Sequence, residues 1–336
     1  MALPRTISVG LIGAGRIGTT HAEIIARRVP GASLVTVADP RPGVAEALGS
    51  SLGARGVLSP EDVFGADDIE AVVIAASSDA HCELVVAAAA AGKAIFCEKP
   101  MSMTLPDAER AVAAAHAAGV PLQVGFNRRF ARDFVAAHDA IVAGAIGTPQ
   151  LMRSLTRDPG LANPGGVPPW TVFTQTLIHD FDALLWLNPG ANPVEVYATA
   201  DALVAPEFKE AGLLDTAVVV ITFDNGARAV AEASFSASYG YDVRAEVFGS
   251  GGMVTAGTTN QSAMILHDST GRHHATARGD VDLFLDAYTG EFVEFTDAVR
   301  EGRAPSVTGE DARRALSVAL ACIESVQANA PVKVAP

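Results

Sequence analysis

The first residues whose types and spacing could support chemistry form a glycine-rich turn near the start of the chain. Gly13, Gly15 and Gly18 stand at the G-x-G-x-x-G spacing, after the apolar run 7–12 and at the start of a helical pattern from about Arg16. In such a turn the first glycine permits the tight bend, the second lets the backbone approach a pyrophosphate, and the third lets the helix pack on the strand. The free N–H groups at the helix start would bind the pyrophosphate. The alternative is an ordinary tight turn, but the strand before it and the helix after it favour a dinucleotide site.

A carboxylate stands where such a site needs one. The second apolar run, 33–38, ends at Asp39, which follows Gly18 by about 20 residues, the separation at which an acidic side chain meets a ribose hydroxyl. A carboxylate repels the 2′-phosphate of NADP, so Asp39 favours NAD. Arg41 leaves some tolerance for NADP.

Residues 1–126 alternate strand and helix patterns, which predicts a doubly wound parallel sheet. Further buried strands are expected at 70–76, 94–97 and 122–124. Ligands of such sheets bind beyond the carboxyl ends of the strands. The residues expected at those ends are Gly13, Asp39, Ser77, Lys99 and Asn127. We therefore expect an α/β Rossmann domain over 1–126.

The pattern changes in residues 127–336. Extended runs follow one another, and Asn225-Gly226 between two of them is a strong hairpin signal. Helices are expected at 173–186, 284–300 and 308–327. These features predict an α+β domain with a large, mainly antiparallel open sheet.

Composition excludes several classes of protein. With 336 residues, two domains are expected, and 49% hydrophobic residues argue against disorder. The net charge is −14 without a basic cluster, so neither nucleic acid nor an anionic membrane is an expected partner. The longest apolar stretch, 84–91, is far shorter than a membrane span, and the N-terminus lacks a signal-peptide pattern. Cys82, Cys97 and Cys322 have neither zinc-site nor disulfide spacing, which predicts reduced thiols in a cytoplasmic protein without a metal.

Lys99 is the first candidate catalytic residue. It follows a predicted buried strand and precedes Pro100, which biases Lys99 away from helical geometry. A lysine at a strand end, near a nicotinamide, could donate a hydrogen bond to a substrate hydroxyl or relay its proton. The alternative is a surface lysine that pairs with Glu98.

His179 is the second candidate catalytic residue. Gln175 precedes it by four residues and Asp182 follows it by three, so the three side chains would share one face of the predicted helix 173–186. A histidine there could take a hydroxyl proton while hydride leaves the same carbon. The alternative is a histidine that forms hydrogen bonds within a helix–sheet core.

Several other side chains could contact a polyol. One of the two arginines Arg128 and Arg129 could contact cofactor or substrate, and the other could be structural. Trp170 could form one wall of a sugar-sized pocket or anchor the proline-rich loop. Hydroxyl or carboxylate contacts could come from Asp158, Tyr239, Tyr241 and Tyr288.

Over nearly its whole length, the chain resembles the glucose–fructose oxidoreductase / inositol 2-dehydrogenase / rhizopine-catabolism (Gfo/Idh/MocA) family, with inositol 2-dehydrogenases as the most similar subgroup. The resemblance rests on the glycine turn, on Asp39, and on the following segments: Glu98-Lys99-Pro100, Gly125 to Phe130, Gln175 to Asp182, Tyr239-Gly240-Tyr241 and Asp286-Ala287-Tyr288. It implies an NAD(P)-dependent dehydrogenase that acts on a small polyol or sugar and assembles as a dimer or tetramer through the open face of the second sheet.

The resemblance also implies roles for individual residues. Lys99 resembles the family's catalytic lysine and His179 its proton-accepting histidine, with Gln175 as the third catalytic candidate. Expected cofactor contacts are Gly13, Gly15, Arg16, Ile17, Gly18, Asp39, Ser77, His81, Glu98 and Lys99. Expected substrate contacts are Arg128, Asp158, Trp170, Gln175, His179, Tyr241 and Tyr288.

Gln175 departs from the pattern of inositol dehydrogenases, which have an aspartate at this position. Glutamine donates and accepts hydrogen bonds, but it cannot stabilise an imidazolium as a carboxylate does, and it is one methylene longer. The nearby Pro168-Pro169-Trp170 segment also indicates a reshaped pocket. The leading hypothesis is an NAD-dependent, inositol 2-dehydrogenase-like enzyme. The alternatives are an oxidoreductase of the same fold respecialised for a modified sugar or aminocyclitol, and a catalytically silent dinucleotide-binding sensor.

Overall fold

The computed structural model describes residues 5–160 and 163–336, which form two compact units. The first unit contains the chain up to Asn127 together with Asp286–Arg313. The second contains Arg128–Leu285 and Arg314–Pro336. The sequence prediction placed all of 127–336 in one functional domain. By its packing, however, the segment Asp286–Arg313 belongs with the N-terminal residues.

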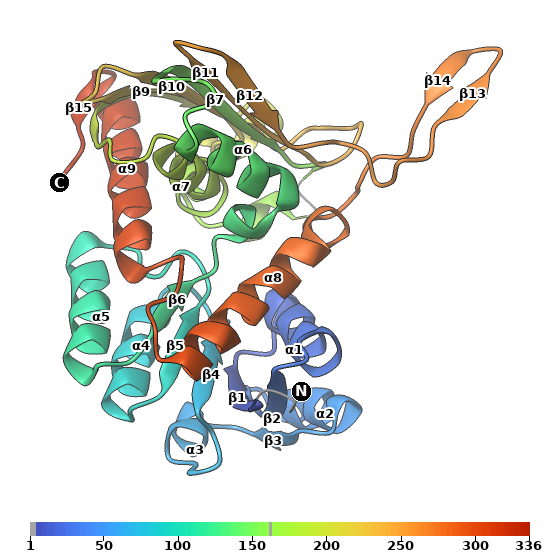
Figure 1. The fold of residues 1–336 in the computed structure, drawn as a ribbon, viewed down its shortest axis with the longest axis vertical. Helices are drawn as coiled ribbons and strands as arrows, with labels where there is room; N and C mark the ends of the chain where they lie inside the picture. Colours follow the sequence, from blue (N-terminus) through green and yellow to red (C-terminus); the bar gives the residue numbers. More distant parts are fainter. Residues whose placement is uncertain (1–4, 161–162) are drawn as a thin grey trace. The chain divides into compact units, whose positions relative to one another are not determined.

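The first unit contains a six-stranded parallel sheet in the order β3-β2-β1-β4-β5-β6 (Figure 1). Its strands are β1 Ile7–Ile12, β2 Ala32–Ala38, β3 Arg55–Val57, β4 Ala71–Ile74, β5 Ala94–Cys97 and β6 Leu122–Val124. The helices between them are α1 Arg16–Arg28, α2 Val44–Leu52, α3 Pro60–Phe64, α4 His81–Ala90 and α5 Leu105–Ala118. The predicted doubly wound sheet is confirmed, and the strand order reverses between β1 and β4.

Burial explains why these short runs form strands. Every residue of β4 and of β5 is buried, as expected for central strands covered by helices on both faces. The helix starts follow local signals. Ser59 caps α3 by accepting from the Glu61 N–H, and Thr104 caps α5 by accepting from Asp107, with a proline in the first turn of each helix.

The second unit contains a seven-stranded sheet in the order β12-β11-β7-β10-β9-β8-β15. Its strands are β7 Pro149–Arg157, β8 Pro193–Asp201, β9 Thr216–Phe223, β10 Arg228–Ser234, β11 Asp242–Gly249, β12 Met253–Ala256 and β15 Val332–Lys333. All neighbours pair antiparallel except β7 and β10, so the predicted mainly antiparallel sheet is confirmed. The predicted hairpin at Asn225-Gly226 joins β9 to β10, and Gly226 has φ of +89° there.

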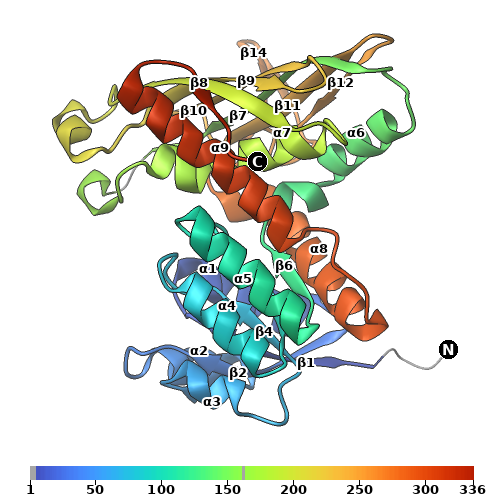
Figure 2. The same cartoon turned by 90° about the vertical axis from the view of Figure 1, so that its left-hand side faces the viewer.

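Helices cover one face of this sheet (Figure 2). They are α6 Arg132–Val142, α7 Ile178–Trp186 and the part of α9 (Gly309–Ala328) from Arg314 onward. Helix α8, Asp280–Glu301, starts earlier than expected and has a kink at Phe284. A separate hairpin, β13 Leu266–Asp268 and β14 Gly271–His273, extends away from the sheet (Figure 1). Over the described residues, no helix combines the length and apolar character that a membrane crossing requires.

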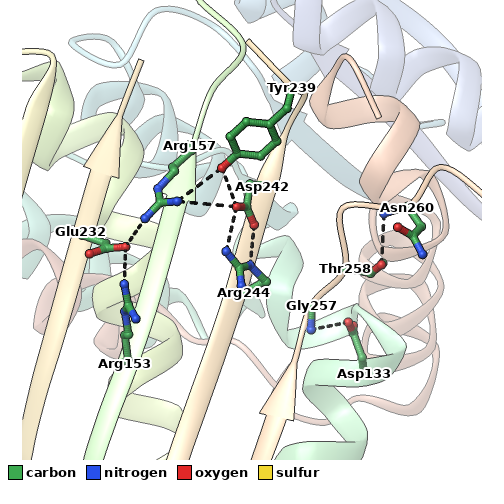
Figure 3. A network of polar contacts seen from close by, with 10 residues as sticks. All are labelled: Asp133, Arg153, Arg157, Glu232, Tyr239, Asp242, Arg244, Gly257, Thr258 and Asn260. Atoms are coloured by element: carbon green, nitrogen blue, oxygen red, sulfur yellow. Dashed lines mark hydrogen bonds and ion pairs between the residues drawn. The ribbon is translucent and has the colours of Figure 1, made fainter. Parts of the chain in front are cut away.

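The other face of the sheet carries a network of charged side chains (Figure 3). The Glu232 carboxylate accepts hydrogen bonds from Arg153 (2.8 Å) and from Arg157 (2.5 Å), which join β10 to β7. Asp242 accepts from the Tyr239 hydroxyl at 2.7 Å and pairs with Arg244. Tyr239, one of the possible polyol contacts, is therefore part of this surface network.

Candidate active site

The glycine turn has the geometry that the sequence predicted. Gly13 adopts φ of +96°, and a Cβ there would lie 2.6 Å from the main chain that follows β4. A Cβ on Gly18 would lie 1.8 Å from the Gly13 carbonyl oxygen, whereas a Cβ on Gly15 would meet no atom within 4 Å. The turn is thus tightly packed on one side and open at Gly15, which fits a pyrophosphate of NAD. The first residues of α1 are Arg16 and Ile17.

Asp39 is buried beside this turn, at the end of β2. Its Oδ2 accepts from the Ala14 N–H at 2.9 Å, and its Oδ1 accepts from the Arg41 N–H at 3.0 Å. The Arg41 guanidinium adds two bonds of 2.9 Å. This guanidinium lowers the pKa of Asp39 to about 2, so the carboxylate is charged at neutral pH. Because the Arg41 side chain is 61% exposed, it can move to make room for a ribose.

His81 and Ser77 follow the end of β4. The Ser77 carbonyl accepts from the Ala80 N–H at 2.9 Å in the turn before α4. His81 begins α4 and is buried, with Nδ1 2.8 Å from the Pro100 carbonyl and Nε2 3.1 Å from the Ala76 carbonyl. The structure therefore gives His81 main-chain partners at two strand ends, while its expected cofactor contact stays a prediction.

Glu98 also points into the interior. Its Oε1 lies 2.6 Å from the His21 Nε2, and its Oε2 accepts from the Lys99 N–H at 3.0 Å. Burial by itself would raise the pKa of Glu98, but the hydrogen bond and charge of His21, with the charges of Lys99 and His81, outweigh it and keep the pKa below its usual range. Lys99 is half-buried at the carboxyl end of β5. The alternative of a surface Lys99–Glu98 pair is therefore wrong for Glu98, which is a buried partner of His21.

In the second unit, the predicted helix over 173–186 is confirmed, but its start is not α-helical. Val172–Leu177 is a π-helix, and α7 begins only at Ile178. Gln175 therefore lies on π-helical backbone and His179 in the first turn of α7, and both are half-exposed. Single π-helical turns are frequent at functional sites.

Trp170 starts this irregular segment. It has φ of +62°, which is unusual for a bulky side chain and costs conformational energy. Its N–H donates to the Gly212 carbonyl at 3.0 Å, and its own carbonyl accepts from Phe173 and Thr174 at 2.9 and 3.1 Å. The hydrogen bonds of the Trp170 N–H and carbonyl thus fix the start of the helical segment that carries Gln175.

Arg128, whose expected substrate contact stays a prediction, forms a buried ion pair with Asp180. Its Nη1 donates to Asp180 Oδ1 at 2.7 Å, and its Nη2 donates to the Thr156 hydroxyl. The Asp180 carboxylate also accepts from Ser154 at 2.5 Å and Thr156 at 2.7 Å. Arg129 pairs with Asp182 at 2.5 Å. Both arginines therefore have structural partners next to His179.

Asp158 and Tyr241 are brought together, whereas Tyr288 lies in the other unit. Burial raises the pKa of the Tyr241 hydroxyl well above its usual range, and the charge and hydrogen bond of Asp158 add to this. Tyr288 is buried on α8, with its ring 5.6 Å from His21 in an edge contact. Tyr288 thus packs against the partner of Glu98.

Sequence reasoning missed His21 and Glu291. His21 is fully buried three residues after Gly18, and Glu291 is fully buried on α8. A polar residue on the inward face of the first helix was the available signal for His21. For Glu291, no local pattern distinguishes it from an exposed helical glutamate.

The glycine cradle, the charged Asp39 and the strand-end lysine define a dinucleotide-binding oxidoreductase. Two family models match the chain: the oxidoreductase family, NAD-binding Rossmann fold, over residues 7–126, and the oxidoreductase family, C-terminal alpha/beta domain, over residues 138–334. The chain belongs to this Gfo/Idh/MocA family.

Relatives and solved structures agree with this assignment. The myo-inositol 2-dehydrogenase of Thermotoga maritima is 36% identical, and the alignment covers 97% of this chain and 98% of the relative. The inositol 2-dehydrogenase of Rhizobium meliloti is 37% identical, covering 98% of this chain and 100% of the relative. The crystal structure of scyllo-inositol dehydrogenase from Lactobacillus casei with bound NAD(H) and scyllo-inositol has a TM-score of 0.91 at 28% identity, covering 99% of this chain and 100% of that one.

Proposed function

We propose that the protein is an NAD-dependent dehydrogenase that oxidises a secondary hydroxyl of a cyclic polyol, with inositols as the leading substrates. The observation that carries the proposal is the group formed at the carboxyl ends of β1, β2 and β5 by the open Gly15 turn, the charged Asp39 and Lys99. Relatives that align over nearly the whole chain are inositol dehydrogenases, which supports the substrate class.

The proposed roles follow from ordinary acid–base chemistry. A bound NAD supplies the hydride acceptor. His179 takes the hydroxyl proton as the carbon–hydrogen bond breaks, so that the alcohol loses one hydride and one proton and becomes a ketone. Lys99 donates a hydrogen bond to the same oxygen, and Gln175 orients the hydroxyls or the imidazole. Asp39 binds the adenosine ribose and favours NAD, while Arg41 leaves NADP possible.

The test is the initial rate of NAD and NADP reduction with myo- and scyllo-inositol, measured for wild type, Lys99→Met and His179→Asn. We expect turnover by wild type with NAD and a loss of kcat in both variants, with NADH binding preserved. Binding of NADH without turnover of any polyol would instead favour the sensor and would overturn the proposal.

A second candidate function is supported by Gln175. The π-helix that carries it and the positive φ of Trp170 give this segment a backbone that differs from a regular helix. A modified sugar or an aminocyclitol is then the substrate, since a neutral amide in place of a carboxylate changes which substituents are bound. A substrate panel that includes the Gln175→Asp variant distinguishes the two.

We also propose that the protein is a homo-oligomer, a dimer or tetramer, that forms through the open face of the seven-stranded sheet. The support is two groups of exposed apolar side chains, one on β7, β11 and β12 (Leu151, Phe248 and Met253) and one on β8 and β9 (Tyr197, Val218 and Val220). Large exposed apolar patches commonly mark protein interfaces. Light scattering on the double variant Val218→Lys/Val220→Lys should give a smaller mass than on Val142→Lys, an exposed control on α6. Equal masses for the double variant and the control would contradict an interface on this face of the sheet.

A cytoplasmic location is part of the proposal. It is supported by the three cysteines, which are all buried free thiols.

A further inference from the structure

Two buried histidines of the first unit contact the residues on either side of Lys99. His21, on α1, contacts the Glu98 carboxylate at 2.6 Å, and the other oxygen of that carboxylate accepts from the Lys99 N–H at 3.0 Å. The side chains of His21 and Glu98 are 0% and 7% exposed. A bond of this length between buried groups is worth much more than one at the surface, because water does not compete for either partner.

His81, on α4, contacts Pro100, the residue that follows Lys99. Its Nδ1 lies 2.8 Å from the Pro100 carbonyl, and its Nε2 lies 3.1 Å from the Ala76 carbonyl. Since a carbonyl oxygen only accepts, each contact is favourable when the His81 nitrogen in it carries a proton. His81 therefore links the segment after β5 to the segment after β4, and the main chain of Lys99 is fixed on both sides.

The two histidines reach Lys99 from opposite faces of the sheet. Helix α1 connects β1 to β2 and α4 connects β4 to β5, which are steps in opposite directions along the sheet. Because parallel crossovers are right-handed, such helices lie on opposite faces, as Figure 1 shows for α1 and α4. The residues on either side of Lys99 are thus held by histidines from opposite faces of the sheet.

The charge near Lys99 is also defined. Burial raises the pKa of Glu291 well above its usual range, and the negative charge of Glu98 raises it further, whereas His21 outweighs burial at Glu98 and keeps the pKa of that carboxyl below its usual range. The titratable and charged groups that face Glu98 from the surrounding elements are His21, Lys99, His81, Cys97 and Glu291. Tyr288 covers the His21 ring at 5.6 Å. Glu98 is therefore the buried anion that faces Lys99.

We propose that His21, acting through Glu98, and His81, acting through Pro100, are positioning residues for Lys99. They fix its main chain at the strand end, and the Glu98 carboxylate keeps a negative charge beside its ammonium group. This inference rests on the proposed function for the claim that Lys99 acts in the reaction, but the positioning itself can be measured without any substrate.

The experiment compares wild type with His21→Leu, His21→Gln, His81→Gln and Glu98→Gln. His116→Leu is the control, because His116 is an exposed histidine on α5 of the same unit. The first readout is the pH dependence of reductive methylation at Lys99, measured by peptide mass spectrometry, with Lys209 and Lys333 as internal references. We expect Glu98→Gln to move the Lys99 labelling midpoint to lower pH by at least about 0.5 unit, because a nearby opposite charge is lost. The references should not move.

The second readout is steady-state kinetics. We expect His21→Leu and His81→Gln to lower kcat about 10- to 100-fold, since small displacements of a catalytic group cost this much. For His21→Leu we expect little change in the KM for NAD. His21→Gln retains a donor near the position of Nε2 and should recover part of the loss. If His21→Leu does not fold, the Glu98→Gln and His21→Gln proteins carry the test.

Two results separate the claims. If Lys99 labelling and kcat in Glu98→Gln and both His21 variants match wild type and His116→Leu, the positioning role is wrong. If wild type turns over no polyol but the Lys99 labelling still shifts in Glu98→Gln, the proposed function fails while the contact between Glu98 and Lys99 stands.

Discussion

Lys99 and His179, the two residues to which we assign the chemistry, are positioned in different ways by their own units. Lys99 lies at the end of a buried parallel strand, and its neighbours are fixed by histidine contacts to Glu98 and to the Pro100 main chain. His179 lies in the first turn of α7, where the neighbouring carboxylates of Asp180 and Asp182 pair with arginines. In the first unit, the contacts therefore fix the main chain on either side of Lys99. A helix is fixed through the side chains on its buried face.

The two regions also differ in their backbone. The strand end at Lys99 is enclosed and continues through a cis peptide bond to Pro100, whereas the segment before His179 combines a positive φ at Trp170 with the π-helix that carries Gln175. Irregular backbone of this kind can change locally without disturbing the sheet beneath it. If the proposed function is right, Lys99 serves the hydride-transfer step, and the segment that carries Gln175 is where substrate preference is set.

The largest expected effect is the loss of kcat on substitution of Lys99. Lys99→Met should lower kcat by about 10²- to 10⁴-fold, the usual contribution of a positioned acid–base group, while NADH binding measured by fluorescence stays close to wild type. Lys209→Met is the matched control, because Lys209 forms an exposed ion pair with Asp201. Equal kcat in both variants would show that Lys99 does not act in the reaction.

The next effect concerns the region around His179. Arg128→Leu should lower the free energy of unfolding by about 3 to 5 kcal/mol, because it leaves the fully buried Asp180 carboxylate without its cation. Urea denaturation measures this change, and Arg128→Leu/Asp180→Leu should recover part of it. The exposed pair of Arg153 with Glu232 gives the control: Arg153→Leu should cost less than about 1 kcal/mol. If Arg128→Leu has wild-type stability and a raised KM for polyol, Arg128 binds substrate and is not needed for stability.

The smallest effect is the pH dependence of stability at the cofactor site. The pKa of Asp39 is lowered in the folded state from 3.8 to about 2, so its contribution is fully present above pH 3.8 and is lost as the pH falls through about 2. The difference in free energy of unfolding between wild type and Asp39→Asn should therefore shrink over this window, as measured by urea denaturation at stepped pH. A difference that stays constant down to pH 2 would contradict the Asp39–Arg41 geometry.

The sequence predicted the parts of the molecule that depend on short-range pattern. The glycine turn, Asp39 and the Lys99 strand end were all recognisable, because period and spacing are local and a parallel sheet brings its carboxyl ends together. The two sheets and the Asn225-Gly226 hairpin were predicted for the same reason.

What the sequence did not predict depends on contacts between distant residues. His21 and Glu98 are far apart along the chain, and nothing local indicates that they form a buried pair. Arg128 was expected at the substrate, and its ion pair with the buried Asp180, 52 positions further along the chain, could not be predicted from any local pattern. The π-helix at Val172–Leu177 was missed because apolar periodicity does not distinguish it from an α-helix.

The most direct test of the account is the initial rate of NAD reduction at high pH over a panel of inositol isomers, aldoses and aminocyclitols, run with wild type and Gln175→Asp. We predict that wild type oxidises at least one cyclic polyol with NAD. If this is an inositol, Gln175 is a variation that the inositol site tolerates. If inositol activity appears only in Gln175→Asp, the pocket is respecialised and the dehydrogenase chemistry remains. Tight NADH binding with no turnover of any compound by either protein would contradict the account.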